Sequence, residues 1–146
     1  MSRPMLPAPL QPLAALFVKT GVGIGGLPEM PRRLVLGLAW AGLPAAPMSE
    51  RDVNEVLKAQ LAGTASFLGT DHVELRRWLV DAGWLVRDGF GREYRRVPVA
   101  VLPPALQPLA RAFDGVDVGA IAAATRAAHA AEREARLRVW KERKAG

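Results

Sequence analysis

Three segments with helical spacing of apolar residues, followed by two short segments of strand character, constrain the fold of this 146-residue chain most strongly. The helical patterns cover residues 31–43, 49–61 and 71–82, and the strand patterns cover residues 84–87 and 93–97. The two strand segments flank residues 88–91, a four-residue loop rich in turn formers. This order predicts a mainly α protein with a small β-hairpin, which is an α+β fold.

The start of the second helix is marked most clearly. Ser49 and Asp52 have the spacing of a capping box, in which each side chain satisfies a free backbone N–H group. Gly83 marks the end of the third helix, since glycine readily ends a helix. Helix, helix, helix and hairpin is the order of a winged helix-turn-helix domain, which we place at residues 31–103.

The segments on either side of this domain differ from it in composition. Residues 1–30 form an arm rich in proline and glycine, of which residues 1–12 are expected to be extended or disordered. Residues 21–26 match the letters of a dinucleotide-binding loop, but prolines follow directly and no βαβ unit surrounds them, so a flexible linker is expected. Residues 104–146 form a helical extension, with a short helix over 105–113 and a long helix from residue 117 to about 141.

The composition argues against catalysis and against a cofactor. The chain has no cysteine, which excludes disulfides, thiolate zinc sites and cysteine nucleophiles. His72 and His129 lie in different elements without a second ligand at metal-binding spacing, and Ser49 has no matched base. We therefore expect a protein that is not an enzyme and binds no metal or cofactor. No apolar run reaches the roughly 20 residues of a membrane span, so we also expect it to be cytoplasmic.

Three separated blocks carry a family resemblance: residues 49–57 (SERDVNEVL), 75–87 (LRRWLVDAGWLVR) and 91–96 (GREYRR). In order and type they resemble the bacterial family called domain of unknown function 2087, over roughly residues 31–97. Members of that family are usually described as transcriptional regulators, so the resemblance implies DNA binding. The chain departs from the family in residues 62–69, a loop longer than the turn of about 3–4 residues in DNA-reading helix-turn-helix units.

The candidate nucleic-acid contacts are basic residues and one histidine on the third helix and the wing. On the exposed face of the third helix they are His72, Arg76 and Arg77, and in the wing they are Arg87, Arg92, Arg95 and Arg96. A guanidinium group can bond a guanine edge twice or clamp a phosphate. The alternative is that Arg76 and Arg77 pair with Glu74, Asp81 or the wing and only stabilise the domain. Residues 71–96 carry six basic and five acidic residues, which is a small excess for a duplex-binding surface.

The long C-terminal helix presents a seam of small residues at spacings of three and four. Its members are Ile121, Ala124, Ala128, Ala131 and Ala135. The seam either packs on the core of its own chain, the interpretation we favour, or forms a homodimer with the basic end of the helix on phosphate. Residues 104–146 carry eight basic and five acidic residues, so much of the net charge of +6 lies there.

Two functions follow from these features. The first is a DNA-binding transcriptional regulator that uses the third helix and the wing on double-stranded DNA. The second is a winged-helix protein-interaction module, or an RNA- or ribosome-associated protein, without sequence-specific DNA binding. The near-neutral wing, the long loop with Phe67 and Leu68, and the apolar N-terminal arm favour the second.

Overall fold

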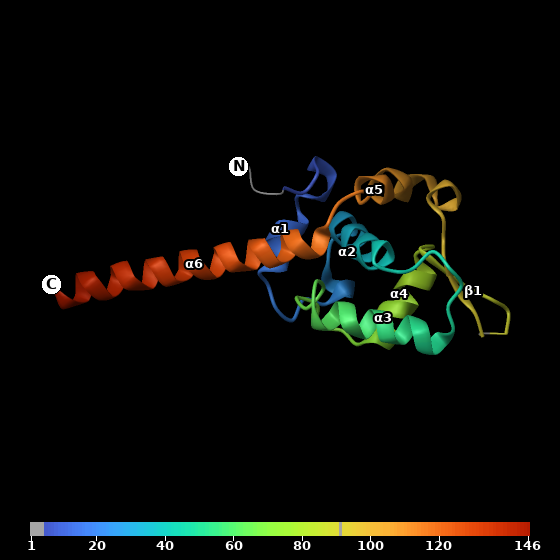
Figure 1. The fold of residues 1–146 in the computed structure, drawn as a ribbon, viewed down its shortest axis with the longest axis horizontal. Helices are drawn as coiled ribbons and strands as arrows, with labels where there is room; N and C mark the ends of the chain where they lie inside the picture. The colour runs from blue at the N-terminus through green and yellow to red at the C-terminus, as the bar shows by residue number, and fades with distance from the viewer. Residues whose placement is uncertain (1–4, 91) are drawn as a thin grey trace.

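A computed structural model describes residues 5–90 and 92–146 and contains a helical body from which one long helix projects (Figure 1). In chain order the elements are α1 (Leu13–Phe17), α2 (Glu29–Ala41), α3 (Glu50–Ala62), α4 (His72–Asp81), β1 (Leu85–Arg87), β2 (Tyr94–Arg96), α5 (Gln107–Ala112) and α6 (Val118–Ala145). The fold is therefore mainly helical with a small antiparallel sheet, as the sequence predicts. Among the described residues, no helix combines the length and the apolar character needed to cross a membrane.

The ends of α3 and α4 follow the capping signals in the sequence. The backbone N–H of Asp52 donates to Ser49 Oγ at 3.1 Å, and the N–H of Ser49 donates to Asp52 Oδ2 at 3.4 Å, which confirms the capping box. Asp71 caps α4 by accepting from the N–H of Glu74 at 2.8 Å. Gly83 then ends the helix with a φ of +89°, a conformation that glycine adopts without strain.

A segment distant in sequence pairs with the hairpin through backbone hydrogen bonds. Within it, Leu85 pairs with Arg96 and Arg87 pairs with Tyr94. Met48, just before α3, forms an isolated antiparallel bridge to Tyr94, with both N–H to O distances at 2.8 Å. The chain between α2 and α3 is therefore fixed to the free edge of β2.

One continuous core runs through the body, and its two largest side chains come from α2 and the residue before β1. Trp40 and Trp84 are both buried, with ring centroids 5.5 Å apart. The indole N–H of Trp40 donates to the carbonyl of Val97 at 2.9 Å, which satisfies a polar group that burial would otherwise leave unpaired. This contact fixes the end of the hairpin to α2.

The N-terminal arm packs on the body, and the prediction that residues 1–12 are extended or disordered is wrong for residues 5–12. A 3-10 helix forms at Ala8–Leu10, and Leu6 and Leu10 are buried. The prolines fix φ, so this segment loses less conformational entropy on folding than an unrestricted chain would. Burial of the two leucines is then enough to order it. Residues 1–4 lie outside the described part of the chain.

The glycine-rich segment after α1 is also ordered, so the prediction of a flexible linker is wrong. The N–H of Val22 donates to the carbonyl of Phe67 at 2.9 Å, and the N–H of Gly69 donates to the carbonyl of Val22 at 2.8 Å. Phe67 and Leu68 are buried. The long loop between α3 and α4 is thus a docking surface for the chain's own N-terminal segment, and these two apolar residues are not available to a partner.

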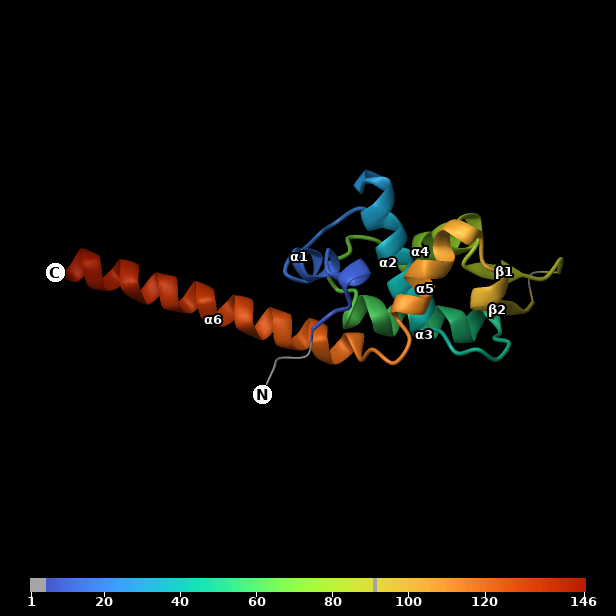
Figure 2. The same ribbon diagram turned by 90° about the horizontal axis from the view of Figure 1, so that it is seen from above.

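Helix α6 has two parts with different surroundings. Its first part packs beside α1, and its remainder extends away from the body in both views (Figures 1 and 2). Arg126 holds the junction, donating to the carbonyls of Phe17, Gly63 and Thr64 at 2.8, 3.1 and 2.9 Å. Ile121 is buried, whereas every residue from 130 to 146 is exposed.

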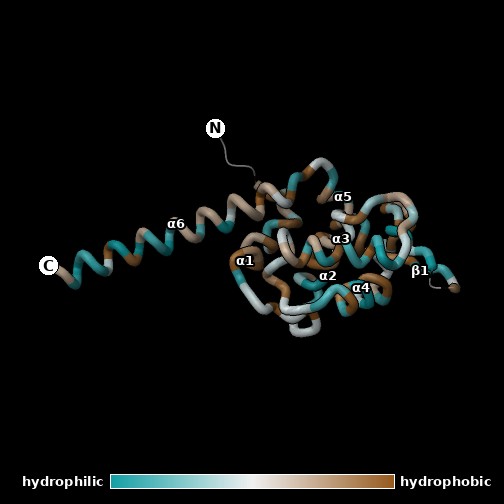
Figure 3. Tube along the Cα trace, turned by 60° about the horizontal axis from the view of Figure 1, so that its bottom comes forward, coloured by the Kyte–Doolittle hydropathy of each residue, from teal (hydrophilic) through white to brown (hydrophobic). Residues whose placement is uncertain are grey.

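The alanine seam of α6 is therefore divided. The interpretation that it packs on the chain's own core is confirmed at Ile121 and partly at Ala128. It is wrong at Ala124, Ala131 and Ala135, which are exposed. Hydrophilic residues predominate along the projecting part (Figure 3). Alanine fits both environments, because it buries little surface and has a high helix propensity, so its spacing alone does not show where the contact ends.

Candidate nucleic-acid interface

The outward side of α4 and the hairpin form one shallow depression. It has a volume of about 210 Å³ and is lined by Val73, Arg76, Arg77, Val80, Asp81, Arg87 and Tyr94. Three of the seven candidate residues therefore meet at one surface. Arg77 and Arg87 are exposed there, and among the described residues neither forms an ion pair or a side-chain hydrogen bond.

Arg76, next in sequence to Arg77, is held within the body. Its guanidinium group donates to Asn54 Oδ1 and forms an ion pair with Glu50 at 3.1 Å. The same group lies over the ring of Tyr94, 5.6 Å from its centroid, and the side chain is only 16% exposed. Arg76 thus joins α3, α4 and β2. It has the expected stabilising role, but its ion-pair partner is Glu50 of α3 rather than Glu74 or Asp81.

Arg96 is also bound to the body. It donates to the carbonyl of Leu43 at 3.0 Å and to that of Ala41 at 3.4 Å, and it lies 3.8 Å from the ring centroid of Trp40. Burial lowers the pKa of the Arg96 guanidinium below its usual value, because desolvation disfavours the charged form. Its guanidinium group donates to carbonyls at the end of α2, so Arg96 fixes the hairpin to that helix.

The other candidates do not line this depression. Arg95 forms an ion pair with Glu93 at 3.0 Å and is 65% exposed. Arg92 is exposed at the end of the hairpin loop, where its backbone N–H donates to Asp88 Oδ1 at 3.0 Å. His72 is half-buried in the first turn of α4. Gly91 of the predicted loop lies outside the described residues.

Carboxylates border the exposed arginines. Asp81 lines the same depression as Arg77 and Arg87, and Glu74 lies in the first turn of α4, where the hydroxyl of Thr70 donates to it at 2.6 Å. These groups reduce the positive potential near α4. The α4–hairpin region is therefore moderately basic, and its exposed cations without an ion pair among the described residues are Arg77, Arg87 and Arg92.

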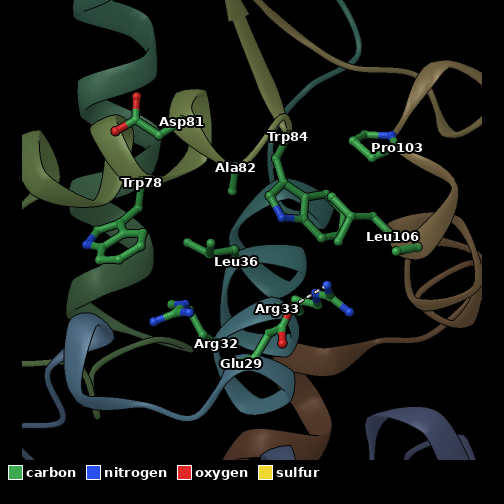
Figure 4. Close-up of a pocket in the computed structure, with 11 residues that line it drawn as sticks. Glu29, Arg32, Arg33, Leu36, Trp78, Asp81, Ala82, Trp84, Pro103 and Leu106 are labelled. Carbon is green, nitrogen blue, oxygen red and sulfur yellow. Dashed lines mark hydrogen bonds and ion pairs between the residues drawn. The ribbon is translucent and has the colours of Figure 1, made fainter.

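A second depression lies on another flank of α4. It has a volume of about 320 Å³ and is bordered by Trp78, Leu36, Trp84 and Arg32 (Figure 4). Arg32 lies 5.3 Å from the ring centroid of Trp78, and the buried indole N–H of Trp84 has no hydrogen-bond partner among the described residues. Trp78 is half-buried and lines this depression rather than filling the interior.

Sequence reasoning missed contacts that join distant segments. Neither the Met48–Tyr94 bridge nor the attachment of Arg126 to three carbonyls has a local sequence signal. Asn54 and Glu50, which hold Arg76, lie on the polar face of the second predicted helix, where side chains are usually solvated.

Comparison with known proteins gives one finding that bears on this surface. Residues 28–96 match the model of a family described as Uncharacterized protein conserved in bacteria (DUF2087). The matching segment runs from α2 to the end of β2, so it contains α3, α4 and the hairpin that form the candidate surface. It supports membership of this uncharacterised family. No curated protein and no solved structure matches the chain.

Proposed function

We propose that α2, α3, α4 and the hairpin form a winged helix that binds double-stranded DNA, and that the chain is a transcriptional regulator without catalytic activity. The element order supports this proposal, as does the Met48–Tyr94 bridge, which adds a third backbone segment beside β2. In such a domain the third helix enters the major groove and the wing contacts the backbone. Here α4 is the third helix and the β1–β2 hairpin is the wing.

The observation that carries the proposal is the exposure of Arg77 and Arg87 on one surface shared by α4 and the hairpin. Guanidinium groups without internal partners are free to bond phosphate or a guanine edge. Arg92, exposed at the end of the hairpin loop, adds a positive charge there, where phosphate contacts position a protein without specifying sequence. Arg95 pairs with Val86 and so lies on the hairpin face opposite Arg87. Arg76 and Arg96 support this surface from within, while Arg77, Arg87 and Arg92 contact the nucleic acid.

The test is fluorescence anisotropy of a labelled duplex titrated with the protein over a range of salt concentrations. We expect salt-dependent binding, and we expect Arg77→Ala/Arg87→Ala to weaken it at least tenfold. Loss of two phosphate contacts reduces the slope of log K against log salt by about 1.8. Lys19→Ala/Arg111→Ala is the matched control, because it removes the same charge from exposed positions outside α4 and the hairpin. Absence of binding at low salt, or an equal loss in the control, contradicts the proposal.

Docking of a protein partner is a second candidate function, favoured by exposed apolar residues on the same elements. Phe90 at the hairpin tip is 87% exposed, and Val86 and Val73 are 53% and 37% exposed. Co-purification of a stoichiometric protein partner that is lost in Phe90→Ser, together with no duplex binding, supports this function over the first.

A homodimer through α6 completes the proposal for the regulator. The exposed seam residues Ala131 and Ala135 lie on the same side of the helix as the buried Ile121 and permit close approach of a second helix. Sedimentation equilibrium tests this directly. A concentration-dependent dimer that Ala131→Glu/Ala135→Glu converts to monomer is expected, and a monomer at all concentrations contradicts it.

A further inference from the structure

The projecting half of α6 carries a large aromatic side chain with no place in the core. Residues 130–146 are exposed throughout, and Trp140 is 56% exposed within them. Leu137, one turn earlier, is 50% exposed. An exposed indole beside an exposed leucine is a candidate contact surface, and the charges around it indicate what it contacts.

Those surroundings are strongly asymmetric in charge. At 3.6 residues per turn, four basic residues lie within about 60° of Trp140 around the helix axis. They are Arg133, Arg136, Arg143 and Lys144. The three carboxylates of this segment, Glu132, Glu134 and Glu142, lie about 80° or more away from Trp140. We call the four cations and Trp140 the basic face.

The side chains of the basic face are free to contact a ligand. Lys144 Nζ lies 5.2 Å from the ring centroid of Trp140. Within residues 118–146, all of which the structure describes, no ion pair forms. Arg133, Arg136, Leu137 and one carboxylate, Glu134, border a shallow depression beside Trp140. The basic face therefore presents four unpaired cations around one accessible ring.

Cations around an exposed ring match the chemistry of single-stranded nucleic acid. The cations bond phosphates, and the ring stacks on a base, as in proteins that bind single strands without sequence preference. A duplex hides the faces of its bases, so it leaves the indole without a partner. Arg133 and Lys144 are about 17 Å apart along the axis at 1.5 Å per residue, a distance that spans several nucleotides.

We propose that the basic face of α6 binds single-stranded nucleic acid, RNA or unpaired DNA, through the four cations and stacking on Trp140. Two copies of this face repel each other, since each carries four positive charges. A membrane surface is matched less well, because the helix lacks a broad apolar face opposite its cations: Arg138 and Glu142 lie there. This site lies outside the α4 surface and does not depend on the function proposed for it.

The experiment uses the full chain, a labelled single-stranded oligonucleotide and the same sequence as a duplex. Arg136→Ala/Arg143→Ala is expected to weaken single-strand binding about tenfold and to lower the salt slope by about 1.4. Arg138→Ala/Lys141→Ala removes the same charge from the same segment but outside the basic face, and is expected to change affinity less than threefold. Trp140→Leu is expected to weaken binding at least fivefold, because base stacking is lost.

Three results overturn the proposal. One is an equal loss of affinity in the two double variants, which assigns the effect to net charge alone. Another is unchanged single-strand binding in Trp140→Leu with its helix content intact by circular dichroism. The third is tighter binding to vesicles containing anionic lipid than to the oligonucleotide. Single-strand binding that is retained in Arg77→Ala/Arg87→Ala shows that this site is separate from the α4 surface. This conclusion does not depend on whether the protein binds the duplex.

Discussion

Arg76 and Arg77 are adjacent residues of one type, and the structure assigns them different roles. Replacing each with methionine keeps the aliphatic stem and removes the charged group. Arg76→Met removes an ion pair with Glu50 at 3.1 Å, a charge-assisted hydrogen bond to Asn54 and a contact 5.6 Å from the Tyr94 ring centroid. Arg77→Met removes none of these. The free energy of unfolding should therefore fall for the first variant only.

The magnitude follows from the three contacts of Arg76. A hydrogen bond to a charged group contributes about 1.5 kcal/mol, and a half-exposed ion pair contributes about 0.5 kcal/mol after solvent screening. The cation–π contact adds about 0.5 kcal/mol. Because one side chain makes all three, they are not independent, and we expect a total loss of about 2 kcal/mol for Arg76→Met. An exposed side chain such as Arg77 should change stability by less than about 0.5 kcal/mol.

Urea unfolding monitored by circular dichroism measures this difference. With a slope near 2 kcal/mol/M, as is typical of small domains, the midpoint of Arg76→Met should fall by about 1 M. The midpoint of Arg77→Met should stay near that of the wild type. Equal midpoints for the two variants would refute the assignment of Arg76 as a structural residue.

Three further changes test other parts of the fold by the same unfolding assay. Gly69→Ala places a Cβ 3.0 Å from the Gly21 backbone, so it should destabilise by about 1–3 kcal/mol, while Gly26→Ala, with no heavy atom within 4 Å, should cost much less. A small effect at Gly69 would show that the two segments are not packed together. Ser49→Ala removes the N-cap of α3 and should cost about 1 kcal/mol, with Ser49→Asp restoring most of it. Arg126→Met should destabilise by about 2 kcal/mol and release α6, seen as faster amide exchange near residue 121, and unchanged exchange there would contradict its anchoring role.

The parts of the fold that were predictable depend on local signals. The capping box of α3 and the turn-rich loop before β2 involve neighbours in sequence, so their residue types specify the structure directly. Contacts between residues distant in sequence have no comparable local signal. The Val22–Leu68 and Met48–Tyr94 bridges each join segments about 46 residues apart, and nothing in either partner's surroundings identifies the other.

The candidate site shows the same division. Its position on α4 and the hairpin was predictable from the element order, and the comparison with the bacterial family covers those elements. Which arginines lack an internal partner was not predictable from the sequence, because that depends on which residues lie opposite each one in the fold. Arg76 faces Asn54 across the helix pair, and Arg96 faces the carbonyl of Leu43, whereas Arg77 faces solvent.

The most direct test of the proposed DNA interface is a titration of the isotope-labelled full chain with duplex DNA, followed by backbone amide chemical shifts. The account predicts that the largest shift changes occur in α4 and the hairpin, around Arg77 and Arg87, and that they diminish as salt is raised. Shift changes confined to the far half of α6, or no changes at low salt, would contradict the proposal that α4 and the hairpin bind DNA.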